Sequence, residues 1–157
     1  SILEVGTAVG YSSILMSENM PKDCRIVTIE NYDKRIQAAR NNIKRAGKED
    51  CIQLIEGDAL KVLKELEGPY DFIFMDAAKG QYRNFFKLLF PILSENGIMF
   101  IDNLLFRGMV TLESEDIPKR YKTIVTRLKV FIEELNENKN FVLLPFGDGI
   151  GIIKNKI

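Results

Sequence analysis

The sequence predicts a doubly wound α/β fold whose mostly parallel, seven-stranded sheet ends in an antiparallel hairpin. Short apolar runs alternate with amphipathic stretches from residue 2 to residue 138, which is the pattern of strands joined by helices. Runs such as Ile26-Val27-Thr28-Ile29 are typical of strands buried inside a parallel sheet. The last two runs flank Gly147-Asp148-Gly149, a hairpin-type turn, so an antiparallel strand is expected at or near one edge.

The first half of the chain contains three predicted strands, each followed by a predicted helix. Asp33 is a suitable N-cap for the second helix, and Gly47 stands where a C-terminal glycine cap belongs. The predicted strands are residues 2–5, 25–30 and 51–56, and the predicted helices are residues 11–20, 33–46 and 59–66.

The second half continues the alternation and then departs from it. One predicted helix stops near Pro91, and a longer one begins at Pro118, a position where a helix tolerates proline. An irregular loop is expected between them, over residues 103–117. The predicted strands are residues 70–75, 98–101, 141–145 and 150–154, and the predicted helices are residues 81–90 and 118–138.

Composition indicates an ordinary globular domain and excludes several kinds of chemistry. The 157 residues suit one domain, and 22 basic residues balance 22 acidic ones, so no global positive field indicates nucleic-acid binding. The lack of histidine excludes histidine-based catalysis and histidine-ligated zinc. No apolar run is long enough to span a membrane, so we expect no membrane partner. Two cysteines, Cys24 and Cys51, are too few for a disulfide framework, which favours a reduced, cytoplasmic setting.

Most of the predicted parallel strands end in acidic residues. Ligands of doubly wound sheets bind outside the carboxyl ends of the strands, so these side chains are expected to meet around one ligand. The acidic positions and their neighbours are Glu4 with Gly6, Glu30, Asp58, Asp76, and Asp102 with Asn103.

The turn after the first strand predicts a nucleoside ligand. Gly6 and Gly10 stand four residues apart, whereas a dinucleotide fingerprint requires G-x-G-x-x-G. This spacing disfavours a nicotinamide-dependent oxidoreductase and suits an amino-acid ligand that carries a nucleoside. Glu30, at the end of the second strand, can accept both hydroxyls of a ribose. Asp58 could accept from an adenine amino group, cap the following helix, or do both.

Two further strands end in oxygen-bearing side chains that could converge. Asp76 ends the fourth strand and Asp102-Asn103 ends the fifth, and adjacent strands lie about 4.8 Å apart. Two carboxylates and an amide oxygen suit Mg²⁺, Mn²⁺ or Ca²⁺ rather than zinc. The alternative is that Asp76 caps a helix and that Asp102-Asn103 forms a simple turn.

Lys79 stands three residues after Asp76 and is the candidate general base. Beside a divalent cation the neutral amine is favoured, because a second positive charge is disfavoured there. Without a metal, a solvated lysine at the start of a helix is the plainer interpretation.

In order along the chain, these motifs resemble the metal-dependent S-adenosylmethionine O-methyltransferases, the catechol and caffeoyl-CoA O-methyltransferase family. The resemblance covers essentially all 157 residues, and the segments after Asp76 and Asp102 are most similar to the bacterial branch containing tRNA 5-hydroxyuridine methyltransferase. It implies one Rossmann-like methyltransferase domain over residues 1–157. It also implies a homodimer and, before the first strand, a helical segment that we expect this chain to lack. The runs that carry the resemblance are residues 3–12, 28–30, 57–59, 76–82, 102–108 and 147–150.

The resemblance also implies a role for each candidate site residue. The S-adenosylmethionine site would comprise Glu4, Gly6, Gly10, Ser12, Glu30 at the ribose, Asp58 and Ala59 beside the adenine, and Asp76. The Mg²⁺ ligands would be Asp76, Asp102 and Asn103. Lys79 would correspond to the lysine proposed as the base in the catechol enzymes.

The sequence leaves two classes of methyl acceptor open. A tRNA that carries 5-hydroxyuridine and a small hydroxylated molecule, such as a catechol or a phenolic acyl-CoA, both offer adjacent oxygens to a metal. Basic residues near the last long helix could contact RNA phosphates or form a solvated face. A non-catalytic cofactor-binding module is disfavoured because the candidate catalytic set is complete. The basic residues are Lys119, Arg120, Lys122, Arg127 and Lys129.

Overall fold

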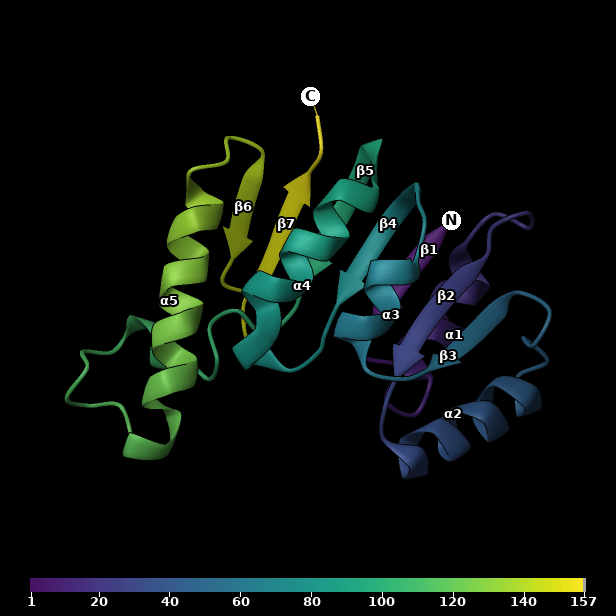
Figure 1. The fold of residues 1–157 in the computed structure, drawn as a ribbon, viewed down its shortest axis with the longest axis horizontal. Coiled ribbons are helices and arrows are strands. Elements are labelled where there is room, and N and C mark those ends of the chain that lie inside the picture. Colours follow the sequence, from purple (N-terminus) through teal and green to yellow (C-terminus); the bar gives the residue numbers. More distant parts are fainter. Residues whose placement is uncertain (157) are drawn as a thin grey trace.

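The computed structural model describes residues 1–156 as one seven-stranded sheet with helices on both faces (Figure 1). The strand order is β3-β2-β1-β4-β5-β7-β6. The first five strands pair in parallel, whereas β7 is antiparallel to both of its neighbours, β5 and β6. This confirms the predicted fold class and places the antiparallel strand one position in from the edge. The strands are β1 (Ile2–Val5), β2 (Ile26–Glu30), β3 (Ile52–Glu56), β4 (Tyr70–Met75), β5 (Leu93–Ile101), β6 (Phe141–Leu144) and β7 (Ile150–Lys154).

Two hydrophobic clusters hold the helices against opposite faces of the sheet (Figure 1). The larger cluster joins α3, α4 and α5 to the central strands through fully buried side chains such as Leu3, Ile73 and Leu128. The smaller one packs α1 and α2 against β1, β2 and β3 around Ile26 and Ile43. The helices are α1 (Tyr11–Asn19), α2 (Asp33–Arg45), α3 (Ala59–Glu65), α4 (Tyr82–Leu89) and α5 (Lys122–Asn136). None of the helices in the described residues is both long enough and apolar enough to cross a membrane.

Two elements begin more than two residues from the start that the sequence predicts. Strand β5 begins at Leu93, five residues before the predicted start, because Leu93 pairs with Tyr70 and is buried. The register between β4 and β5 then shifts before Phe72 pairs with Ile98. The predicted helix over 118–138 is a 3₁₀ turn (Lys119–Tyr121) followed by α5. Local pattern could not show either change, since each depends on pairing or packing with a distant segment.

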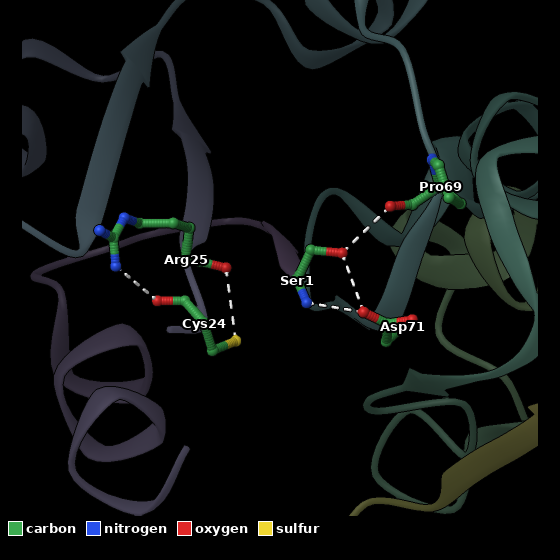
Figure 2. Close-up of polar contacts among 5 residues, drawn as sticks. All are labelled: Ser1, Cys24, Arg25, Pro69 and Asp71. Atoms are coloured by element: carbon green, nitrogen blue, oxygen red, sulfur yellow. Dashed lines mark hydrogen bonds and ion pairs between the residues drawn. The ribbon is translucent and has the colours of Figure 1, made fainter. Parts of the chain in front are cut away.

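Polar contacts around Ser1 and Cys24 lie at the amino edge of the sheet (Figure 2). The Ser1 ammonium lies 2.7 Å from Asp71 Oδ2, and the Ser1 hydroxyl donates to the Pro69 carbonyl at 3.0 Å. The Cys24 thiol donates to the Arg25 carbonyl at 3.7 Å. Cys24 and Cys51 are not joined to each other, and the reduced setting stays a prediction.

The carboxyl edge brings the predicted site residues together. The amide of Asp76 donates to the carbonyl of Val5 at 3.0 Å, and the amide of Asp102 donates to the carbonyl of Met75 at 3.0 Å. These bonds continue the parallel ladders one residue beyond β4 and β5. Asp76 is thereby fixed between the turn after β1 and Asp102.

Candidate active site

A cleft of about 560 Å³ lies at the carboxyl ends of β1, β2, β3 and β4. A second cavity of the same size lies at the amino edge, around Met16, Met20 and Phe72, and none of the predicted site residues lines it. The predicted residues that line the first cleft are Gly6, Glu30, Asp58, Ala59, Asp76 and Lys79. Ala8, Arg35 and Phe85 also line the cleft; sequence reasoning did not single them out as site residues, because nothing in their residue types indicates a ligand contact.

Gly6 occupies a position that no other residue fits. Its φ is +108°, and a Cβ built there would lie 2.0 Å from the carbonyl oxygen of Asp76. The turn after β1 therefore touches the backbone of Asp76 directly. Gly10 has a φ of +84° and packs over Ala39 of α2, so it shapes the entry into α1 without lining the cleft.

Glu4 lies beneath this turn, enclosed by hydroxyl groups. It has no exposed surface, and its carboxylate accepts hydrogen bonds from Ser12, Ser13 and Thr28, the last at 2.5 Å. Thr28 is in turn 2.6 Å from the hydroxyl of Thr7. The structure therefore gives Glu4 and Ser12 a supporting position beneath the turn, and a direct contact of Glu4 with the cofactor stays a prediction. Burial raises the pKa of Glu4, while the hydroxyl donors oppose that rise.

This burial predicts a pH-dependent difference between the wild type and Glu4→Gln. Because the pKa of Glu4 is raised above its ordinary value of 4.5, the folded state holds the proton more tightly than the unfolded chain does. The wild type should therefore lose stability relative to Glu4→Gln as pH rises from about 4.5 through the folded-state pKa. Urea unfolding of both proteins at several pH values measures the difference. The exposed Glu18→Gln control should follow the wild type, and parallel curves for wild type and Glu4→Gln would refute the assignment.

Glu30 is buried and lines the cleft with one carboxylate oxygen partly free. Its Oε1 accepts from the amides of Asn31 at 3.0 Å and Tyr32 at 3.1 Å, and its Oε2 accepts from the amide of Ala8 at 2.9 Å. A carboxylate has about four acceptor positions, so one remains on Oε2. Glu30 can thus accept one ribose hydroxyl without losing a loop contact, whereas the predicted contact with both hydroxyls would displace an amide.

Asp58 is compatible with both of its predicted roles. It is the N-cap of α3, where Oδ1 accepts from the amide of Leu60 at 2.8 Å. Its Oδ2 is not used in this cap. Ala59 and Leu60 line the cleft beside it. The capping bond fixes the side chain at the cleft wall and leaves one oxygen for an amino-group donor.

Asp76, Asp102 and Asn103 form an oxygen-rich edge next to the cleft. Pairing of Met75 with Ile101 places Asp76 beside Asp102, and Asn103 adopts a left-handed φ of +57°, which asparagine tolerates better than most residues. Burial raises the pKa of Asp102; the amide of Asn103 opposes this rise, and the charge of Asp76 adds to it. Two adjacent carboxylates that repel each other fit a cation between them. Among residues 1–156 no group of three or more His, Cys, Asp or Glu is placed to bind a metal ion, so a cation here would depend on the Asn103 amide as well.

Lys79, in the 3₁₀ turn before α4, and Tyr82, the first residue of α4, support this edge. The Lys79 ammonium lies 2.9 Å from Asp76 Oδ1 and 6.0 Å from the centre of the Tyr82 ring. The buried Tyr82 hydroxyl donates to the carbonyl of Asp102 at 2.8 Å. Burial raises the pKa of Tyr82, with the charges of Asp76 and Asp102 adding to the effect. Tyr82 therefore acts as a neutral donor that fixes the backbone of Asp102, a contact that sequence reasoning missed.

The chain is similar to known O-methyltransferases. Residues 1–156 match the O-methyltransferase family. The caffeoyl-CoA O-methyltransferase of Medicago sativa is 32% identical over 97% of this chain, and the catechol O-methyltransferase of Niastella koreensis is 35% identical over 75% of it. The chain spans 65% and 55% of the lengths of these two relatives.

Solved structures show the same fold. The SAH-bound methyltransferase PaMTH1 of Podospora anserina superimposes with a TM-score of 0.88 and 34% identity, over 99% of this chain and 71% of its own. The O-methyltransferase of Bacillus cereus in complex with SAH gives a TM-score of 0.83 and 26% identity, over 98% of this chain and 73% of its own. By sequence and by fold, this chain belongs to the O-methyltransferase family.

Proposed function

We propose that this protein transfers the methyl group of S-adenosylmethionine to a hydroxyl oxygen of an acceptor bound at a divalent-cation site. The observation that carries the proposal is the position of Asp76, which lines the cofactor cleft and stands beside Asp102. The SAH-bound structural relatives support the choice of cofactor. The relatives named catechol and caffeoyl-CoA O-methyltransferases support an oxygen acceptor.

The cleft offers specific groups for each part of the cofactor. Glu30 Oε2 has an acceptor position for a ribose hydroxyl, and Asp58 Oδ2 is available to an adenine amino group. The turn at Gly6 permits close approach of a ligand to the backbone, because no side chain covers it.

Asp76, Asp102 and Asn103 would hold Mg²⁺, or Mn²⁺ or Ca²⁺ in its place. Three protein ligands leave about three positions of an octahedral cation for acceptor oxygens and water. Such a cation stabilises the oxyanion form of a bound hydroxyl.

The chain's own residues complete the reaction. The carbon–sulfur bond of the sulfonium breaks as a carbon–oxygen bond forms, which leaves a neutral thioether. Lys79 Nζ, at the cleft wall beside Asp76, takes the hydroxyl proton when its amine is neutral and releases it to solvent. The remaining contribution is alignment of the oxyanion with the methyl carbon.

For the acceptor we propose tRNA that carries 5-hydroxyuridine, whose 5-oxygen and neighbouring 4-oxygen form the chelating pair. The similarity of the segments after Asp76 and Asp102 to that branch supports this choice. A small catechol-like or phenolic acyl-CoA acceptor is the second candidate, favoured by the names of the relatives. Labelled methyl transfer by the full-length protein to 5-hydroxyuridine tRNA, catechol and caffeoyl-CoA in Mg²⁺ tests both. Transfer to tRNA alone supports the first candidate, transfer to a small acceptor alone replaces it, and transfer to none of the three contradicts both.

The basic residues near α5 differ in their freedom to contact RNA. Lys129 Nζ donates to the carbonyl of Leu112 at 2.6 Å, so it is engaged within the fold. The exposed Arg127 donates only to the carbonyl of Gly80, at 3.2 Å, among the contacts of the described residues. Arg120 lies 4.6 Å from the ring centre of Tyr121. Of these five residues, Arg127 lines a groove of about 360 Å³ together with Lys79, which makes it the phosphate contact to test.

Arg127→Gln should weaken tRNA binding. It should also make the binding constant less sensitive to salt concentration. Loss of one phosphate contact reduces the slope of log K against log salt by about 0.7–0.9. Lys129→Gln is the matched control, since its ammonium is held by Leu112, and its slope should equal that of the wild type. Filter binding at several salt concentrations measures the slopes. An unchanged slope for Arg127→Gln would remove Arg127 from the RNA interface.

A further inference from the structure

The turn between β6 and β7 is hydrogen-bonded to the chain segment that follows Asp102. The amide of Leu104 donates to the carbonyl of Gly149 at 3.0 Å, and the amide of Leu105 donates to the carbonyl of Asp148 at 2.8 Å. The Asp148 carboxylate accepts a third hydrogen bond, from the amide of Arg107. One turn thus binds three amides within four residues of Asn103.

The hydrogen-bonded segment, residues 103–107, has an unfavourable backbone conformation. Asn103, Phe106 and Arg107 have φ values of +57°, +46° and +58°, in the left-handed region that residues with a side chain rarely adopt. Such a conformation persists only where the surrounding structure holds it. The backbone bonds from Leu104 and Leu105 hold the first half of the segment. The Asp148 side chain holds the second half at Arg107, and the Phe106 ring packs against Tyr121 with 5.5 Å between the ring centres.

The fit between turn and segment leaves little room for adjustment. A Cβ built on Gly149 would lie 2.4 Å from Leu105 Cγ and 2.9 Å from the Leu105 nitrogen. The two backbones are therefore in direct contact. A change at the Asp148 side chain is expected to act on the segment through the lost bond to Arg107, while the contact at Gly149 keeps the turn in place.

We propose that Asp148 is a positioning residue, which holds residues 103–107 so that Asn103 keeps its left-handed conformation at the edge formed with Asp76 and Asp102. The proposal rests on the proposed function for its consequence, the binding of a cation at this edge. Its structural part, the restraint of the segment, does not need a metal. The same geometry predicts that the acceptor oxygen of Asp148 matters more than its charge.

Hydrogen exchange of the metal-free protein tests the structural part. Asp148→Ala should speed exchange of the amides of Leu105 and Arg107 by about tenfold or more. Asp148→Asn should remain close to the wild type, since its amide oxygen still accepts. Phe146→Ser is the matched control, because Phe146 lies in the same connection, is 75% exposed and makes none of these contacts. Unchanged exchange in Asp148→Ala would overturn the proposal.

Mn²⁺ binding, followed by the electron paramagnetic resonance signal of free Mn²⁺, tests the consequence. Asp148→Ala should bind Mn²⁺ at least about tenfold more weakly, the effect expected of a group that orients a metal ligand. Asp148→Asn should stay within about threefold of the wild type. Equal weakening in both variants would overturn the positioning role in favour of a charge effect or direct ligation. If wild-type protein bound no Mn²⁺, the metal site of the proposed function would fail, and the exchange result would still decide the role of Asp148.

Discussion

Asp102→Asn is expected to lower the rate of methyl transfer by roughly 10³-fold while leaving cofactor affinity nearly unchanged. Groups that stabilise a developing oxyanion contribute roughly 10²–10³-fold each, and replacing this carboxylate removes one of the two charges that would hold the cation. The cofactor cleft is lined by Asp76 and not by Asp102, so SAH should still bind. Transfer assays and calorimetric titration with SAH separate the two effects.

Asp116→Asn is the matched control for that substitution. Asp116 is exposed, lies in the loop after the same strand, and its side chain makes none of the hydrogen bonds or ion pairs of the described residues. Its activity should match the wild type. Full transfer activity in Asp102→Asn would exclude Asp102 from the chemistry, and equal losses of activity and SAH affinity would mean that it acts on the cofactor instead.

Gly6→Ala is expected to abolish measurable cofactor binding. The new Cβ would lie 2.0 Å from the Asp76 carbonyl oxygen, so the turn or Asp76 has to move, and both line the cleft. A displacement of about 1 Å in an active site can lower the catalytic rate by about 10²-fold. The positive φ of +108° adds backbone strain of roughly 1–3 kcal/mol. Calorimetric titration with SAH measures affinity, and urea unfolding measures stability.

Gly47→Ala is the control that introduces backbone strain at a positive φ without a steric clash of the new Cβ. Gly47 has a φ of +64° with nothing within 4 Å of a built Cβ, and it follows α2, away from the cleft. This variant should lose about 1–2 kcal/mol of stability and keep its SAH affinity. If Gly6→Ala bound SAH as tightly as Gly47→Ala does, the close contact between the β1 turn and Asp76 would not matter for the cofactor.

The sequence was sufficient to predict a mostly parallel sheet and the residues at the ends of its strands. Gly6, Glu30, Asp58 and Asp76 end successive parallel strands, and the physics of such sheets places strand ends around a shared ligand. The convergence of Asp76 with Asp102 follows from the same rule, because their strands are adjacent and in parallel register.

Contacts between distant segments were beyond sequence reasoning. The enclosure of Glu4 needs Thr28 from the neighbouring strand and two serines of α1, so a carboxylate expected to face a ligand is covered. The bond from Arg107 to Asp148 joins residues 41 positions apart. No periodicity or motif indicates such pairs, since they depend on how loops pack once the sheet has formed.

The central claim is that one edge of the sheet joins a methyl donor to an acceptor oxygen at a cation site. The most direct measurement is labelled-methyl transfer from S-adenosylmethionine by the full-length protein, in EDTA and after Mg²⁺ is restored. The structure predicts transfer that EDTA abolishes and Mg²⁺ recovers, with SAH still bound in EDTA. Transfer at full rate in EDTA would contradict a role for Asp76, Asp102 and Asn103 as cation ligands.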